Sequence, residues 1–596
     1  MSHSFHIPVL GLGFSIDTPL KVARYGISSV VSVVDDELIE RMRKFHSEEN
    51  GLSFQPIKKT DEDYRARRIT SYLNLLNQLV NEQVADLKQQ AFTPGSDISR
   101  YFELLPDFSK AKQAYQVMQQ EQNEEKKASM QEELREAIKS GAIEVNIMSK
   151  VDKMNMGKDG LPLGDKFSDA LASLRGFAQS NISSSIILSA GMNPRLYSYL
   201  AEFEEFYPVS SSPAKKKVVL KVSDFRSALI QAKFLAKKGL WVHEFRIESG
   251  LNCGGHAFAT EGYLLGPILQ EFKDKRAEMI DELYGIYKSA RGSELPEILR
   301  PVTKITVQGG IGTAEENTFL QQYYNLDGTG WGSPFLLVPE ATNVDEHTLN
   351  LLKDADEGDF YISGASPLGI PFNNFKKSTA EIQRLERIEK GRPGSPCVKK
   401  FLVSNTEFTE EAICTASREY QNLKIKQLNE AEIAPEEYAV SFNKITEKLC
   451  LCEGLCTSAY LKNNMLKPRE NKAVAICPGP NTAFFSRVYT LDEMVRHIYG
   501  KINLLKDVAR PHAFINELKL YADYLKKDIE NSAQELTDKK LKQLERFKEQ
   551  LLKGVEYYNQ ILPEIHKFCK SYSSSFQKDL TALELQLHRL MIEAAV

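Results

Sequence analysis

The stretch "KVVLKVSDFRSALIQAKFLAKKGLWVHEFRI", residues 217–247, decides the fold class of this chain. It begins with the β-branched run "KVVLKV" and ends with "LWVHEFRI", which has the pattern of a buried strand. Between them, apolar residues recur at helical spacing until a glycine stop at Gly239. The spacing predicts a strand, a helix and a second strand in direct succession. That order is typical of two parallel strands joined by a helical crossover.

Similar apolar runs recur along the N-terminal half of the chain, with helical patterns between several of them. The predicted strands are residues 7–14, 28–34, 142–148, 184–190, 217–222, 240–247 and 304–308, and a weaker, glycine-rich one at 326–333. Eight parallel strands in this length of chain favour a (β/α)8 barrel. A doubly wound open sheet is the alternative that the pattern leaves open.

The composition limits the classes of protein to which this chain can belong. The 596 residues carry a formal net charge of -4, with 42% hydrophobic and 26% charged residues, as in globular proteins that fold into two or three domains. The charge balance argues against a nucleic-acid or membrane-surface partner, and no apolar run approaches the ~20 residues of a membrane span. The N-terminus lacks the pattern of an export signal, and eight cysteines are compatible with reduced thiols. We therefore expect a soluble cytoplasmic protein.

The strand and helix pattern divides the chain into three parts. Residues 1–380 are expected to form the barrel, with a charged helical insertion at about 36–140. Residues 381–482 form a linker and a cysteine-containing accessory region, which begins near the Gly/Pro-rich "GRPGSPC". Residues 483–596 are almost wholly helical in pattern, and we expect them to pack on the barrel or to mediate homo-oligomerisation.

Two glycine-rich turns follow the last predicted strands. In "ITVQGGIGTAEENTF" (305–319) a Gly-Gly turn leads into a helix with Thr313 as the expected N-cap and Glu316 three residues later. The second turn is "GTGWGSPF" (328–335). Glycines let backbone N–H groups approach an anion, and phosphate sites of (β/α)8 barrels often lie at these two positions. The turns therefore predict a phosphate site, with tight turns that bind nothing as the alternative.

A third glycine-rich segment, "ESGLNCGGHAF" (248–258), follows the predicted sixth strand. Gly250, Gly254 and Gly255 would let the main chain pass close to a flat ligand over the barrel mouth. His256 would face that ligand, with an ordinary pKa suited to moving a proton near neutrality.

With these motifs the chain resembles the nitronate monooxygenase group of FMN-dependent (β/α)8-barrel oxidoreductases. That group includes flavin-dependent enoyl reductases and the enoyl reductases of polyunsaturated fatty acid synthases. The resemblance covers about residues 6–345 without the insertion, and it implies FMN as the cofactor. "GLNCGGH" parallels the family's G-x-E-x-(A/G)-G-H, which makes His256 the catalytic base.

The resemblance also assigns the residues that would hold FMN. "IPVLGLGF" is similar to the first strand and the turn under the flavin, and "EVNIM" and "LKVSDFRSALIQA" are similar to the third and fifth strands. "QGGIGT" and "GWGSPF" correspond to the two phosphate loops. The implied cofactor-binding residues are Gly13, Asn146, Lys221, Gly254, Gly255, Gly309, Gly310, Gly332 and Ser333.

The chain departs from the family pattern in two respects. Asn252 replaces the acidic residue of the motif, so that any role of this carboxylate is lost or moves to Glu248. The insertion and the C-terminal third have no counterpart in short nitronate monooxygenases. A larger mouth suggests a larger small-molecule substrate, or one carried on an acyl-carrier protein.

Four cysteines cluster in sequence within the accessory region. Cys450, Cys452, Cys456 and Cys477 stand in "KLCLCEGLCTSAY" and "AICPGPN". Four thiolates could hold a zinc ion or an iron–sulfur cluster, while buried thiols without a metal are the alternative. Cys253 is expected only to pack beside the cofactor site.

Three functions are compatible with the sequence. The first is an FMN-dependent oxidoreductase of nitronate monooxygenase type, with His256 as the proton-transfer residue. The second is a flavin enoyl-thioester reductase, with NAD(P)H as a transient donor because no separate nicotinamide-binding fingerprint is visible. The third is a partner protein that binds flavin without turnover, supported by the helical C-terminus and the charged insertion.

Overall fold

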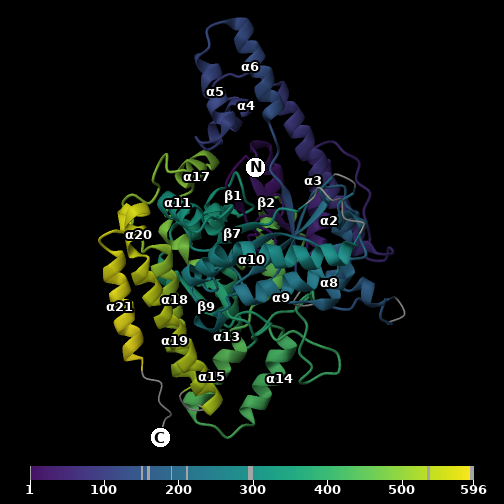
Figure 1. Cartoon of the computed structure of the whole chain (residues 1–596). Helices are drawn as coiled ribbons and strands as arrows, with labels where there is room; N and C mark the ends of the chain where they lie inside the picture. The colour runs from purple at the N-terminus through teal and green to yellow at the C-terminus, as the bar shows by residue number, and fades with distance from the viewer. Residues whose placement is uncertain are drawn as a thin grey trace.

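A closed barrel of eight parallel strands forms the centre of the molecule (Figure 1). The computed structural model describes residues 2–148, 152–157, 161–189, 191–209, 212–292, 300–532 and 537–590. The strands, in barrel order, are β1 (Phe5–Ile7), β2 (Ser28–Ser32), β3 (Ile143–Ile147), β4 (Ser184–Leu188), β5 (Lys216–Val222), β6 (Val242–Glu248), β7 (Lys304–Gln308) and β8 (Gly328–Gly330). Because β1 pairs with both β2 and β8, the predicted (β/α)8 barrel is confirmed and the open sheet is excluded.

The inside of the barrel is filled by alternate side chains of the strands. Val30, Ile187 and Val219 form a small apolar layer. Below the mouth, the buried Arg246 donates to Glu244 at 2.8 Å and to Glu144 at 3.0 Å. β6, which looks continuously buried in the sequence, therefore alternates between outward apolar residues and inward charged residues.

Helices follow most strands and cover the outside of the barrel. They include α7 (Asp169–Gln179), α8 (Pro194–Leu200), α9 (Phe225–Ala236), α10 (Leu265–Arg291), α11 (Ala314–Tyr323) and α12 (Glu346–Lys353). The helix predicted in the deciding stretch is α9, and its N-cap Asp224 accepts from Ser227 N–H at 2.7 Å. The predicted cap of α11 is confirmed as a capping box, with Thr313 and Glu316 bonding reciprocally.

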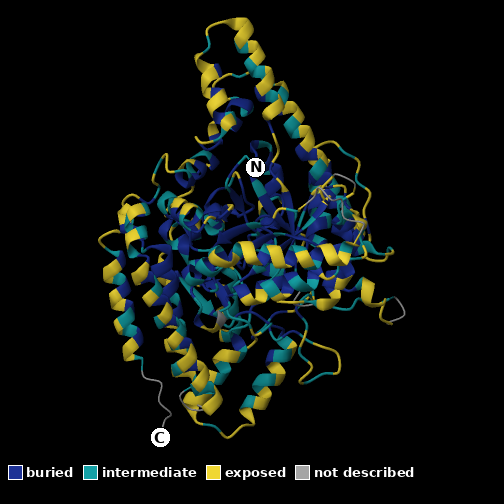
Figure 2. Cartoon of the chain, viewed as in Figure 1, coloured by how far each residue is buried: buried dark blue, intermediate teal, exposed yellow. Residues whose placement is uncertain are grey.

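The charged segment between β2 and β3 is only partly an appendage. It forms α2 (Asp36–Glu49), α3 (Tyr64–Gln89), α4 (Asp97–Leu104), α5 (Lys110–Gln120) and α6 (Glu124–Ala137). One face of α3 is buried, and Thr70 on this helix donates to Gly176 O of α7, so α3 belongs to the outer helical layer. Figure 2 shows that α5 and α6 instead project from the body with mostly exposed surfaces.

The chain beyond β8 covers the barrel mouth and one flank. It contains the hairpin β9 (Phe360–Ser363) and β10 (Phe372–Phe375), then α13 (Thr379–Glu389), α14 (Arg418–Asn429), α15 (Pro435–Thr446), α16 (Leu451–Lys462) and α17 (Leu491–Ile498). The last helices are α18 (Ala513–Ser532), α19 (Asp538–Gln560), α20 (Leu562–Phe568) and α21 (Phe576–Arg589). Within the described ranges, none of the helices combines the length and apolar character that crossing a membrane requires.

Candidate active site

A cavity of about 310 Å³ lies at the carboxyl ends of the barrel strands. Strand alternation points one side chain from the end of each of several strands into it. These polar residues are Ser32 on β2, Asn146 on β3, Ser189 after β4, Lys221 on β5, Glu248 on β6 and Gln308 on β7. The barrel register sets Ser32 beside Asn146 and Glu248 beside Gln308. One layer of the barrel thus forms a polar floor.

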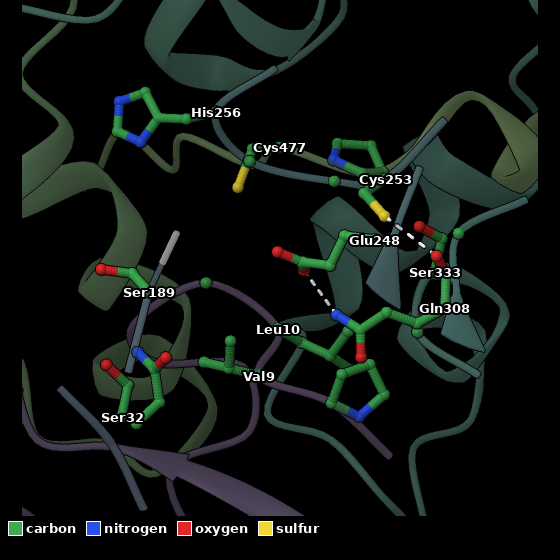
Figure 3. A pocket seen from close by; sticks show the side chains of 18 of the residues that line it. Val9, Leu10, Ser32, Ser189, Glu248, Cys253, His256, Gln308, Ser333 and Cys477 are labelled. Carbon is green, nitrogen blue, oxygen red and sulfur yellow. Dashed lines mark hydrogen bonds between the residues drawn. The ribbon is translucent and has the colours of Figure 1, made fainter. Parts of the chain in front are cut away.

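Glu248 is the centre of the hydrogen bonding on this floor (Figure 3). Its Oε1 accepts from Gln308 Nε2 at 2.5 Å and from Lys221 Nζ at 3.2 Å. Lys221 and Glu248 are both more than three-quarters buried, so their ion pair lies in a poorly hydrated part of the cavity. The pair leaves the Lys221 cation facing the cavity, where it would stabilise negative charge on a ligand.

One floor residue has an unsatisfied polar atom. Ser32 Oγ is buried and has no hydrogen-bond partner among the described residues. A buried hydroxyl without a partner is disfavoured, and its position in the cavity wall suits a polar ligand atom. The sequence pattern did not single out Ser32, although the period of β2 would have placed it at the mouth.

The glycine pair after β7 allows the loop after β6 to pack closely. Gly309 and Gly310 have φ of +116° and +71°, in the region that favours glycine. A Cβ at Gly309 would lie 2.7 Å from Cys253 Sγ, and one at Gly310 would collide with the Asn252 side chain. Both glycines still line the cavity, as do Gly332 and Ser333 after β8 and Gly254 and Gly255 after β6.

A carboxylate of α11 turns back to the backbone just before this helix. Glu316 Oε2 accepts from Gly312 N–H at 2.8 Å and from Thr313 N–H at 3.2 Å. The nearby Arg510 guanidinium donates to Glu316 Oε1 at 2.7 Å and, through its other nitrogen, to Gly310 O. A buried carboxylate thus takes the two N–H groups that precede α11, and the part of this helix end in a phosphate site stays a prediction.

His256 lies at the edge of the cavity, held by the accessory region. Its Nε2 is 2.7 Å from Ser366 Oγ, and its ring packs edge-on against Phe372. Backbone bonds on both sides, Asn373 N to Gly255 O and Ala257 N to Pro371 O, attach this loop to β10. Figure 3 shows His256 and Ser333 well apart, with Glu248 between them in the view.

The C-terminal helix α18 supports the loop that precedes His256. Asn516 Nδ2 donates to Asn252 Oδ1 at 3.2 Å, and Asn252 Nδ2 donates to Ala513 O. Glu517 accepts from Ser249 Oγ and from Leu265 N–H. Burial raises the pKa of Glu517 to about 7. Sequence analysis did not find these partners, because they lie more than 250 residues away in the chain.

Gly13 does not take its predicted place in the cavity wall. Its N–H donates to Leu455 O at 3.0 Å, and an added Cβ would lie 2.9 Å from the same oxygen. Gly11 and Leu12, the residues before it, line the cavity instead. Gly13 is required for the close approach of α16 to the turn after β1, and the flavin contact at this residue stays a prediction.

The four predicted cysteine ligands do not form a metal site. The Cys456 thiol donates to Asp35 Oδ2 at 3.2 Å, Cys450 faces Glu453, and Cys477 accepts from Gly255 N–H through its backbone oxygen. No three His, Cys, Asp or Glu side chains of the described residues form a group that could hold a metal ion. Cys253 packs as expected, and burial raises its pKa well above the ordinary thiol value.

The side of the cavity opposite the floor is apolar. It is formed by residues that follow β8, and these are Leu368, Phe372, Phe401, Leu402, Leu451, Leu455 and Ile476. The cavity therefore combines a polar layer from the barrel with an apolar cover from the accessory region. Such a combination suits a ligand with one polar and one apolar face.

Comparisons with known proteins find only distant similarities. No family model and no curated protein matches the chain. The chain is similar to the enoyl reductase domain of MlnA from the macrolactin biosynthesis cluster of Bacillus amyloliquefaciens, at 14% identity over 63% of this chain and 85% of that chain, with a TM-score of 0.35. A FabK variant from Thermotoga maritima has 10% identity over 65% of this chain and 81% of its own, with a TM-score of 0.29.

A nitroalkane oxidase from Streptomyces ansochromogenes has 10% identity over 85% of this chain and 97% of its own, with a TM-score of 0.34. At these values the similarities carry no argument about function, which rests on the cavity's own residues.

Proposed function

We propose that this protein is an FMN-dependent oxidoreductase of nitronate monooxygenase type, with His256 as its proton-transfer residue. The proposal rests on the observation that the predicted site residues come together at one cavity. The polar floor, the glycine turns after β6, β7 and β8, and His256 all line one cavity at the carboxyl end of a (β/α)8 barrel. Catalytic sites of this fold lie at that end.

The residues present fit FMN. Gly309, Gly310, Gly332 and Ser333 would hold its phosphate through backbone N–H groups and the Ser333 hydroxyl. Asn146, Lys221, Gly254 and Gly255 would hold the ring, and the unpartnered Ser32 hydroxyl offers a further polar contact. When bound, FMN supplies hydride or electron transfer.

The chain's own residues would perform three tasks. Lys221, held in place by Glu248, would stabilise negative charge at the floor of the cavity. His256, positioned by its contact with Ser366, would take a proton from the substrate or return one to it. The apolar cover would exclude water from the reacting atoms.

The apolar cover also favours a second candidate, a flavin enoyl-thioester reductase with NAD(P)H as the donor. An unsaturated acyl chain, free or carried on an acyl-carrier protein, has the apolar surface that Phe401, Leu451 and Leu455 would contact. In this reaction His256 would give a proton to the α-carbon. A small polar nitronate makes less use of such a surface.

The test compares the wild-type protein with the His256→Ala variant. Both should bind added FMN, seen as quenched flavin fluorescence and a shifted visible absorbance. The variant should lose at least about 100-fold in turnover of a nitronate under air or of an enoyl thioester with NADPH. The exposed His347→Ala on α12 is the matched control and should retain full activity.

Each contrary result has a definite meaning. Turnover of His256→Ala at the wild-type rate would contradict the role of His256. A protein that binds no FMN would contradict the cofactor assignment. Binding of FMN with no turnover of either substrate class and no bleaching by NADPH would favour the flavin-binding partner protein.

A further inference from the structure

Two cysteines outside the predicted group lie at the junction of two segments of the accessory region. Ser395 N donates to Ala416 O at 2.9 Å, and Arg418 N donates to Ser395 O at 2.8 Å. These bonds hold the segment that ends in Cys397 beside the segment that contains Cys414. The two thiols lie close enough for each to shift the pKa of the other.

The two thiols differ in accessibility. Cys397 is half-buried between the exposed Pro396 and Val398, so small reagents can approach its sulfur. Cys414 is only 4% exposed. A pair of one accessible and one shielded thiol in mutual contact has the arrangement of a reacting cysteine and its resolving partner.

Their protonation supports these different roles. The neighbouring Cys414 thiol, with a smaller effect of the Lys400 backbone N–H and ammonium, outweighs burial and lowers the pKa of Cys397 to about 7. The same contact with Cys397, together with burial, raises the pKa of Cys414. At neutral pH a large share of Cys397 is therefore thiolate, the form that attacks disulfides. Burial raises the pKa of the neighbouring Cys450 thiol to about 11, which leaves it protonated.

We propose that Cys397 and Cys414 form a redox-active pair that small-molecule disulfides oxidise to an intramolecular disulfide. The Cys397 thiolate attacks one sulfur of the small disulfide, which forms a mixed disulfide and releases one small thiolate. Cys414, after losing its proton to solvent, then attacks Cys397 Sγ and releases the second small thiolate. The two protein sulfurs are oxidised, and the small disulfide is reduced by two electrons to two thiols.

The pair is connected to the wall of the cavity. Four and five residues after Cys397, Phe401 and Leu402 line the cavity, and between them and Cys397 the Lys399 ammonium pairs with Asp35 at the start of α2. Oxidation would therefore add a second tether, through Cys397, to the chain that leads into Phe401 and Leu402, beside the one that Lys399 already makes. The inference does not depend on the identity of the ligand in the cavity.

To test the proposal, the full-length protein is incubated in buffers with increasing ratios of oxidised to reduced glutathione. Quenched samples are analysed by intact mass and by peptide mapping. We expect the wild type to lose two hydrogens and to yield a cross-linked peptide that contains Cys397 and Cys414. Cys414→Ser should instead accumulate one glutathione on Cys397, and Cys397→Ser should form neither product. Cys569→Ser, at a buried cysteine between α20 and the following turn, is the matched control and should behave as the wild type.

Two further measurements test the pair without relying on the variants' stability. Trypsin should cleave after the exposed Lys400 several-fold more slowly in the oxidised wild type than in the reduced protein. Iodoacetamide should alkylate Cys397 in the reduced wild type with a rate that is half-maximal near pH 7. A wild type that stays reduced at every glutathione ratio, or a disulfide that joins Cys397 to Cys450 instead, would overturn the proposal.

Discussion

At the scale of single residues, the loop before His256 relies on groups from the far end of the chain. The family pattern has a carboxylate where this chain has Asn252, and we expect its role to be lost or to move to Glu248. Glu517 of α18 brings a carboxyl group to the same loop, where Ser249 and Leu265 donate to it. Only 2% of Glu517 is exposed, so its ionisation is coupled to the stability of the fold.

Glu517→Gln should change the pH dependence of stability. Burial raises the pKa of Glu517 from 4.5 to about 7, so its contribution to stability is full below pH 4.5 and is lost as the pH rises through 7. Glutamine resembles the protonated acid and does not ionise. Relative to the wild type, the variant should therefore gain about 2–3 kcal/mol in free energy of unfolding between pH 5 and pH 8.

Urea unfolding followed by circular dichroism at both pH values measures this difference. The control is Glu556→Gln, at an exposed position of α19, for which the two pH values should give the same difference from the wild type. A constant difference for Glu517→Gln as well would show that Glu517 is ionised across this range.

At the scale of elements, Asp35 joins three parts of the chain that are far apart in sequence. Its Oδ1 caps α2 by accepting from Glu37 N–H and Leu38 N–H, both at 3.0 Å. Its Oδ2 accepts from the Lys399 ammonium and from the Cys456 thiol of α16. The side chains of Asp35 and Lys399 are 1% and 9% exposed, which makes theirs a buried ion pair.

The Asp35→Asn variant tests the ion pair with Lys399 separately from the cap of α2. Asparagine is a good N-cap, so α2 should remain capped, but the buried Lys399 loses its counter-charge. We expect a loss of about 3–5 kcal/mol in unfolding free energy, measured by urea denaturation. Asp345→Asn is the matched control, because Asp345 caps α12 through Thr348 N–H; it should cost less than about 1 kcal/mol. Equal effects would show that the Lys399 pair contributes little.

Elements within the barrel were more predictable than the contacts made across it. The strand and helix order and the positions of the glycine turns follow from local patterns, whereas Asn146 and Lys221 were implied by the resemblance. The same period-2 pattern would also have placed Ser32 and Gln308 at the mouth, since it needs only the strand bounds. Ser366 and Lys399 reach the site from segments without such periodicity, and nothing local in the sequence specifies which barrel residue they meet.

The cysteine prediction shows the limit of sequence spacing most clearly. The spacing of Cys450, Cys452 and Cys456 suggested a shared ligand, but the first is the N-cap residue of α16 and the others lie on the helix, where their neighbours are set by tertiary packing. Cys397 and Cys414, separated by a loop, are the thiols that meet. Proximity in sequence was therefore a poor guide to proximity in space.

At the scale of the whole molecule, two helical additions have opposite relations to the barrel. The α5–α6 hairpin projects into solvent and buries few apolar side chains, chiefly Tyr115, Met118 and Leu134. The C-terminal helices pack against the ends of β6 and β7. Arg510, which precedes α18, is 7% exposed and bonds to both Glu316 and the Gly310 carbonyl.

Two deletions should therefore differ sharply. Replacing Lys110–Ala137 by a short Gly/Ser linker should leave a soluble protein that melts within a few degrees of the wild type. The chain after the deleted segment stays attached to α4, because Tyr101 Oη accepts from Lys139 N–H at 3.1 Å. Ending the chain at residue 508 should abolish cooperative unfolding, because it leaves the fully buried Glu316 without its counter-charge and Asn252 without its partners. Arg510→Met isolates the first of these losses and should lower the free energy of unfolding by about 3–5 kcal/mol.

If the chain that ends at residue 508 melted cooperatively near the wild-type temperature, the barrel would not need the C-terminal helices. The long-range contacts to the loop before His256 would then be dispensable for its fold.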